Sequence, residues 1–270
     1  LYIYKHNLKQ MHMLCLLNGV IIMKIGHFSS NPQTQAKAAA LNSEDLGLRA
    51  YMQKIYSYMT VGLAITGLVA WLVSGAAVDQ NGNTTALGNA LFNSPLGFIF
   101  MLAPLGLVMM LSFRIQKMKA STAQTMFWVL SGCYGISLAS IFLAYTGESV
   151  ARVFFISSST FLAASIYGYT TKRSLANFGS FLMMGLIGII IAMVVNIFMQ
   201  STMMQFIISV VGVLIFTGLT AYDTQTLKEM YVEGENGETQ VKKAIMGALK
   251  LYLDFLNLFI MLLMLLGNRR

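Results

Sequence analysis

The chain has 270 residues, of which 56% are hydrophobic and only 10% charged, and its mean hydropathy is +0.66. Because soluble domains carry roughly a quarter of their residues as charges, this composition excludes a soluble globule. The net charge of +8 raises the question of nucleic acid, yet no basic, aromatic-interleaved face, Rossmann or P-loop glycine pattern or zinc-ligand cluster is present. We therefore expect an all-α integral membrane protein whose partners are the lipid bilayer and no nucleic acid.

Residues 1–41 form an N-terminal region without a single acidic residue. Their apolar run, 13–23, follows Lys5 and Lys9, but it is too short to span a bilayer and no small-residue cleavage site follows it. We expect this extension to be disordered or to lie upstream of the true start.

From residue 42 to residue 270, seven apolar segments approach the roughly 20 residues that a bilayer-spanning helix requires. In chain order they cover 55–77, 95–113, 125–145, 150–170, 180–199, 205–226 and 246–266. The sequence therefore predicts one membrane domain of seven helices at 42–270.

Basic residues gather before the first segment and after the second, fourth and sixth: Lys37, Arg49, Lys54, Arg114, Lys117, Lys119, Lys172, Arg173, Lys228, Lys242 and Lys243. The other connections hold Asp79 and Glu148, with Arg152 as their one base. This distribution predicts a cytoplasmic N-terminus. If the last segment spans the membrane fully, Arg269 and Arg270 lie outside, against the preference of basic residues for the cytoplasmic side. A re-entrant last segment would return them to the cytoplasmic side.

Asp223 and Asp254 are the only acidic residues inside these membrane-length segments. A carboxylate near the bilayer core costs roughly 2.5–3.5 kcal/mol, so it usually has a partner or a function. At a rise of about 1.5 Å per residue, Asp223 lies about 5 Å and Asp254 about 12 Å inside the cytoplasmic ends of their helices. An antiparallel hairpin thus holds both carboxylates at comparable depth.

Two carboxylates about 4 Å apart repel by about 4 kcal/mol at an effective dielectric of 20. We therefore expect the pair to share one proton, in a short hydrogen bond that joins the two helices. A second proton breaks this bond. Loss of the shared proton breaks it too and leaves two anionic groups that suit a hard cation such as Ca²⁺. The pair is predicted to be a proton sensor and a Ca²⁺ site.

Polar neighbours offer a structural alternative, in which the aspartates only bond helix ends or hydroxyl groups and never titrate. Thr220 and Thr224 flank Asp223, and Asn257 lies on the same helix face as Asp254.

Two cationic residues complete the set of candidate supporting residues. Lys250 lies four residues before Asp254 and is placed to reach and neutralise it. Arg114 ends the second segment, and we expect it to snorkel to the membrane interface, with an inward-facing position as the lesser alternative.

A catalytic alternative comes from the Tyr222-Asp223 dipeptide, which is similar to that of presenilin-type intramembrane aspartyl proteases. Those enzymes pair it with a Gly-x-Gly-Asp motif and a following Pro-Ala-Leu. Here Asp254 ends a Leu-Tyr-Leu-Asp sequence and no proline follows it. We therefore expect no enzyme.

Five stretches carry a wider resemblance: LRAYMQKIYSYM (48–59), YTGESVARVFFISSSTF (145–161), YGYTTKRSLANFGSFLMMGLIGIIIAMVVNIF (167–198), GVLIFTGLTAYDTQTLKEMY (212–231) and GALKLYLDFLNLF (247–259). With them the chain resembles the Bax inhibitor-1 (transmembrane BAX inhibitor motif) family, most closely its bacterial YccA-like branch. The resemblance implies a seven-helix fold in which the other six helices surround the last. It also implies a multi-pass protein of the bacterial inner membrane.

The resemblance further implies a pH-sensitive calcium leak channel, with Asp223 and Asp254 as its proton sensor. It also implies, as an alternative, a regulatory partner of a membrane protease of the FtsH type that transports nothing. One departure concerns the acid that characterised calcium-leak relatives carry about three turns before the position of Arg114. Here Ala103 and Pro104 stand near that place, so the corresponding salt bridge cannot form.

Overall fold

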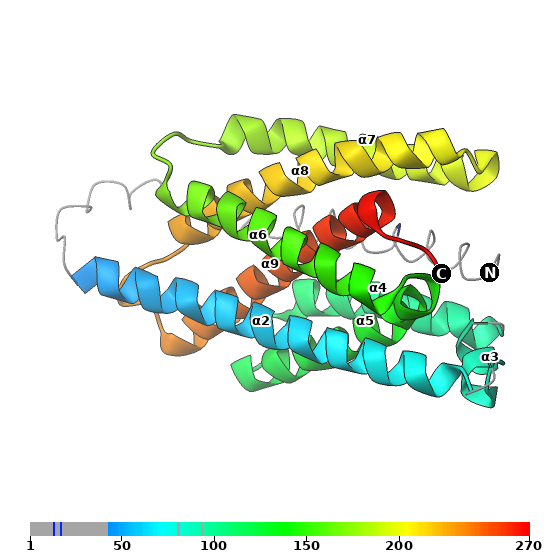
Figure 1. Cartoon of the computed structure of the whole chain (residues 1–270). Coiled ribbons are helices and arrows are strands. Elements are labelled where there is room, and N and C mark those ends of the chain that lie inside the picture. Colours follow the sequence, from blue (N-terminus) through cyan, green and yellow to red (C-terminus); the bar gives the residue numbers. More distant parts are fainter. Residues whose placement is uncertain (1–12, 14–16, 18–42, 80–81, 93) are drawn as a thin grey trace.

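The computed structural model describes Met13, Leu17 and residues 43–79, 82–92 and 94–270 (Figure 1). The expectation for 1–41 therefore lies outside the described residues, apart from those two positions. In the three longer ranges the helices are α2 Ser43–Ala77, α3 Ala86–Phe92, α4 Pro95–Arg114, α5 Ala120–Ala144, α6 Gly147–Thr170, α7 Ala176–Met199, α8 Thr202–Glu229 and α9 Gly237–Leu266. Isolated bridges are the only β-structure in this part of the chain, so the all-α prediction is confirmed.

Each of the seven predicted apolar segments lies in a helix of its own. Within the described ranges, α2 from Leu46 and the five helices α5 to α9 are long and apolar enough to cross a membrane. The apolar stretch of α4, Ile99–Arg114, is shorter. The structure thus supports a multi-pass membrane protein, while the count of seven complete spans stays a prediction.

The connection before α9 is shorter than predicted from its polar sequence. The sequence predicts a loop over 228–243, but α8 continues to Glu229 and α9 already begins at Gly237. Asn236 caps α9, because its side-chain oxygen accepts a hydrogen bond from the N–H of Glu238 (3.0 Å). Hydropathy marks only the part of a helix that lies in the bilayer, whereas capped polar turns extend the helix beyond it.

The last helix, α9, lies at the centre of the bundle. All residues from Ala244 to Leu263 are buried, which is typical of a helix that is covered on every side. α9 contacts α2, α5, α6 and α8, while α4 packs against α5 and α7 against α8 (Figure 1). The predicted central position of the last helix is therefore confirmed.

The C-terminus is held at the connection between α5 and α6. The backbone N–H of Arg270 donates a hydrogen bond to the carbonyl of Ala144 (3.1 Å). The guanidinium of Arg269 lies 5.9 Å from the centre of the Tyr145 ring. α9 therefore runs the length of the bundle and does not turn back, so its C-terminus lies at the end opposite to the start of α2 (Figure 1).

α6 and α8 approach each other closely at Gly168. A Cβ atom at this position would collide with the backbone carbonyl of Ala221. Small residues at such crossings allow two membrane helices to approach closely. Gly168 therefore sets the spacing between α6 and α8, and α8 carries Asp223.

We predict that Gly168→Leu lowers stability by about 1–3 kcal/mol or more, because the added side chain forces the helices apart. Gly188→Leu on α7 is the matched control, since a Cβ there meets no described atom within 4 Å. Thermal unfolding in detergent micelles measures both variants. Equal unfolding midpoints for the two would contradict the tight crossing.

Candidate functional site

Asp223 on α8 and Asp254 on α9 lie together in the interior of the bundle. Their exposed fractions are 0% and 1%, and their carboxyl groups lie close enough to act electrostatically on each other. α8 and α9 are antiparallel neighbours with a short connection, so residues a similar distance from that connection face each other. The structure thus brings together the two aspartates that the sequence singled out.

Lys250 joins this pair, although not with the partner predicted from its spacing. Its Nζ atom donates a hydrogen bond to Oδ1 of Asp223 at 2.9 Å, across the interface between α9 and α8. The spacing of four residues pointed from Lys250 to Asp254, one turn away on the same helix, and this prediction is wrong for the direct ion pair. The long lysine side chain reaches the facing helix, while its charge still acts on Asp254.

The hydrogen bonds of this cluster leave several buried oxygen atoms without a donor. Among the described residues, Oδ2 of Asp223, Oδ2 of Asp254 and Oγ1 of Thr224 have no hydrogen-bond partner. Thr220 instead donates to the carbonyl of Phe216 on its own helix (2.8 Å). The cluster therefore contains buried polar atoms whose hydrogen-bonding capacity is not filled, which is costly in a low-dielectric interior.

Two other candidates hold different positions. The amide of Asn257 donates to the carbonyl of Leu253 on its own helix (2.9 Å), and the side chain is buried. Arg114 is exposed at the end of α4. In the described part of the chain it makes no hydrogen bond or ion pair with either aspartate. The structure therefore does not bring Arg114 into the site.

Gln225 is a positioning residue beside the aspartate pair, and its role was not predicted from the sequence. Its Oε1 accepts a hydrogen bond from the N–H of Leu175 (2.7 Å), and its Nε2 donates to the carbonyl of Arg173 (2.8 Å). These two bonds fasten the connection between α6 and α7 to α8, two residues after Asp223. The sequence feature that could have indicated this role is an amide side chain two residues after Asp223, at the end of an apolar segment.

The chain matches a family model described as "Inhibitor of apoptosis-promoting Bax1" over residues 48–270. An uncharacterized protein of Rickettsia prowazekii is 46% identical, over 84% of this chain and 92% of its own length. The inner membrane protein YbhL of Escherichia coli K12 is 44% identical, over 83% of this chain and 94% of its own length. A membrane protein of Streptococcus pyogenes serotype M1 is 35% identical, over 83% and 95% respectively. The chain therefore belongs to the Bax inhibitor-1 family of membrane proteins.

Proposed function

We propose that this protein is a pH-sensitive cation leak pathway of the bacterial inner membrane, with Ca²⁺ as the permeant ion. A charged latch of Asp223, Lys250 and Asp254 closes it. The observation that carries the proposal is the 2.9 Å contact between Lys250 Nζ and Asp223 Oδ1 inside a bundle of membrane-length helices. Charged groups at such depth are costly, and they usually mark ion pathways or proton relays.

In the closed state that we propose, every member of the latch has a partner. Asp223 is ionised and accepts from the ammonium group of Lys250, while Asp254 is protonated and donates to Asp223. The three groups are then neutral as a set, and they join α8 to α9. A buried ion pair of this kind is costly to break, because the remaining partner is left as an uncompensated charge.

Acidification opens the latch in this proposal. A proton on Asp223 removes its negative charge and leaves the ammonium of Lys250 buried without a counter-charge. Breaking a buried pair in this way costs about 3–5 kcal/mol, and the contact between α8 and α9 is destabilised by this amount. The two helices then separate, and cations pass along the central helix.

The latch also argues against the aspartyl protease alternative. Such enzymes need two carboxyl groups that share a proton and face a water molecule and a substrate. Here one carboxylate is bonded to an ammonium group, and the exposed fractions of Asp223 and Asp254 are 0% and 1%.

Calcium entry into liposomes that contain the purified protein and an enclosed indicator tests the proposal. With the pH equal on both sides, we expect entry to rise as the pH falls. Asp223→Asn removes the group whose protonation opens the latch, so this variant loses the pH dependence. Asp254→Asn replaces a carboxyl group that is already protonated in the closed state with an amide that can also donate to Asp223, so this variant keeps the pH dependence. Glu148→Gln is the matched control, because it removes an exposed carboxylate that pairs only with Arg152 in the described structure, and it keeps the pH dependence.

No entry above that of empty liposomes at any pH, with folded protein present, would overturn the calcium leak. Binding to a membrane protease of the FtsH type would then be measured for the same variants. An adaptor keeps its partner when the aspartates are replaced, whereas a channel loses its regulation.

A further inference from the structure

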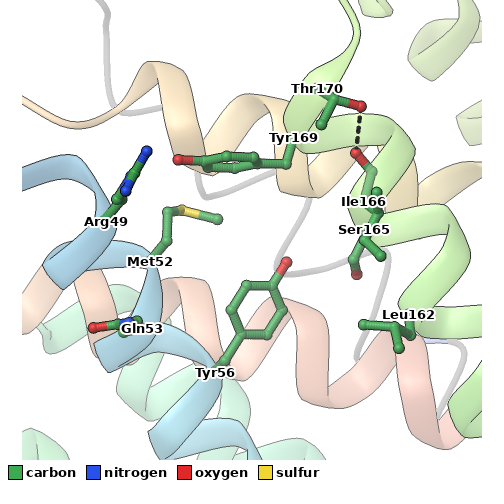
Figure 2. Close-up of a pocket in the computed structure, with 9 residues that line it drawn as sticks. All are labelled: Arg49, Met52, Gln53, Tyr56, Leu162, Ser165, Ile166, Tyr169 and Thr170. Atoms are coloured by element: carbon green, nitrogen blue, oxygen red, sulfur yellow. Dashed lines mark hydrogen bonds between the residues drawn. The ribbon is translucent and has the colours of Figure 1, made fainter. Parts of the chain in front are cut away.

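A groove of about 480 Å³ lies between the first half of α2 and the second half of α6. This volume is within the range of roughly 300–1,000 Å³ that is typical of small-molecule sites. Figure 2 shows side chains from both helices directed into it, among them Arg49, Met52, Tyr56, Leu162, Ser165 and Tyr169. None of these residues belongs to the aspartate latch.

The middle of the groove combines apolar walls with hydroxyl groups. Leu162 and Ile166 of α6 are exposed, although they lie on a helix long and apolar enough to cross the membrane. The hydroxyl of Tyr56 points into the groove from the opposite side (Figure 2). Ser165 is buried (4% exposed), and its Oγ atom has no hydrogen-bond partner in the described part of the chain. A buried hydroxyl with an open hydrogen bond indicates a place for a polar ligand atom.

One end of the groove is positively charged. Arg49 is exposed there, and the ring of Tyr169 extends toward it (Figure 2). Lys228 of α8 lies 5.2 Å from the centre of the same ring and donates to the carbonyl of Tyr169 at 2.9 Å. Lys172 and Arg173 follow α6 directly and are exposed. The charge pattern predicts that this end faces the cytoplasm.

We propose that this groove binds one anionic phospholipid. Its phosphate lies against Arg49 and the hydroxyl groups, and one acyl chain runs along Met52, Leu162 and Ile166. The groove opens between two helices of membrane length, so lipid is the molecule that reaches it first. A cationic mouth above an apolar channel complements a negative headgroup with a hydrocarbon tail. The inference needs only insertion in a membrane and is independent of the proposed leak.

Native mass spectrometry of the full chain tests this binding, after equilibration with equal amounts of phosphatidylglycerol and phosphatidylcholine in detergent. We expect the parent protein to retain one phosphatidylglycerol molecule. Arg49→Gln weakens retention about fivefold, the effect of one interfacial cation, whereas Arg49→Lys keeps it. Leu162→Trp fills the groove and abolishes retention without a change of charge.

Two variants outside the groove serve as matched controls. Lys54→Gln removes an exposed cation from the same helix, and Phe155→Trp enlarges a 70% exposed side chain on α6. Both retain the lipid as the parent does. Retention by Arg49→Gln and Leu162→Trp equal to that of the controls, or no preference for phosphatidylglycerol in the parent, would overturn the proposal.

Discussion

Lys250→Met alone will destabilise the protein by about 3–5 kcal/mol, because it leaves the buried carboxylate of Asp223 without its ammonium partner. Replacing both residues, as Lys250→Met with Asp223→Asn, will restore most of this loss, since no uncompensated charge remains. The single variant will also regain stability as the pH falls, because protonation removes the same uncompensated charge. The complete double-mutant cycle compares the parent, Lys250→Met, Asp223→Asn and the double variant, and their unfolding is measured in mixed detergent and dodecyl sulfate micelles.

Lys243→Met provides the comparison for this cycle. Lys243 also lies on α9 and pairs with Glu235 at 2.7 Å, but the Glu235 side chain is 20% exposed and stands in the polar connection before the helix. We expect Lys243→Met to cost about 0–1 kcal/mol, because water can solvate the carboxylate that remains. Equal losses for Lys250→Met and Lys243→Met, or a double variant as unstable as the sum of its single changes, would show that the buried pair is not coupled.

The helices of this fold were predictable because the bilayer imposes a simple rule on the sequence. Each of the seven apolar segments lies within a helix, and the most buried helix is the one predicted to be central. The polar turns at both ends of the 228–243 region were not predictable by the same rule. Their stability comes from capping and from helical neighbours, which hydropathy does not measure.

The candidate site was predictable in part, for a related reason. Counting residues from the helix ends gave Asp223 and Asp254 comparable depths, and depth is a property of sequence position alone. The partner of Lys250 depends instead on how α8 and α9 are rotated about their axes, which spacing along one helix cannot give. The hydrogen bonds of Gln225 and the groove between α2 and α6 could not be predicted for the same reason, since both arise only when separate segments of the chain meet.

The ammonium group of Lys250 occupies a position on Asp223 that a bound cation would otherwise take. A Ca²⁺ ion requires about six to eight oxygen ligands. Among residues 43–79, 82–92 and 94–270, no three or more histidine, cysteine or acidic side chains are placed so that they could hold a metal ion together. The oxygens available beside the two carboxylates are those of neighbours such as Thr224. Calcium binding at the aspartate pair therefore requires that the ammonium be displaced.

We accordingly expect calcium to stabilise Lys250→Met and to leave the parent protein unchanged. At a calcium concentration ten times the dissociation constant of the variant, the gain is about 1.4 kcal/mol. Unfolding midpoints with CaCl₂, against NaCl of equal ionic strength, measure this gain, and Lys250→Met with Asp254→Asn should lose it. An equal gain in the parent would show that Lys250 does not act as a tethered cation.

The same substitution separates binding from flux in the liposome assay. Conduction requires a site that a cation enters readily and also leaves readily. A pair of carboxylates freed from Lys250 holds Ca²⁺ longer, so calcium entry through Lys250→Met should saturate at a lower calcium concentration than entry through the parent. If Lys250→Met neither binds calcium nor changes its entry, the aspartate pair lies outside the ion pathway, and the pathway must follow other helices of the bundle.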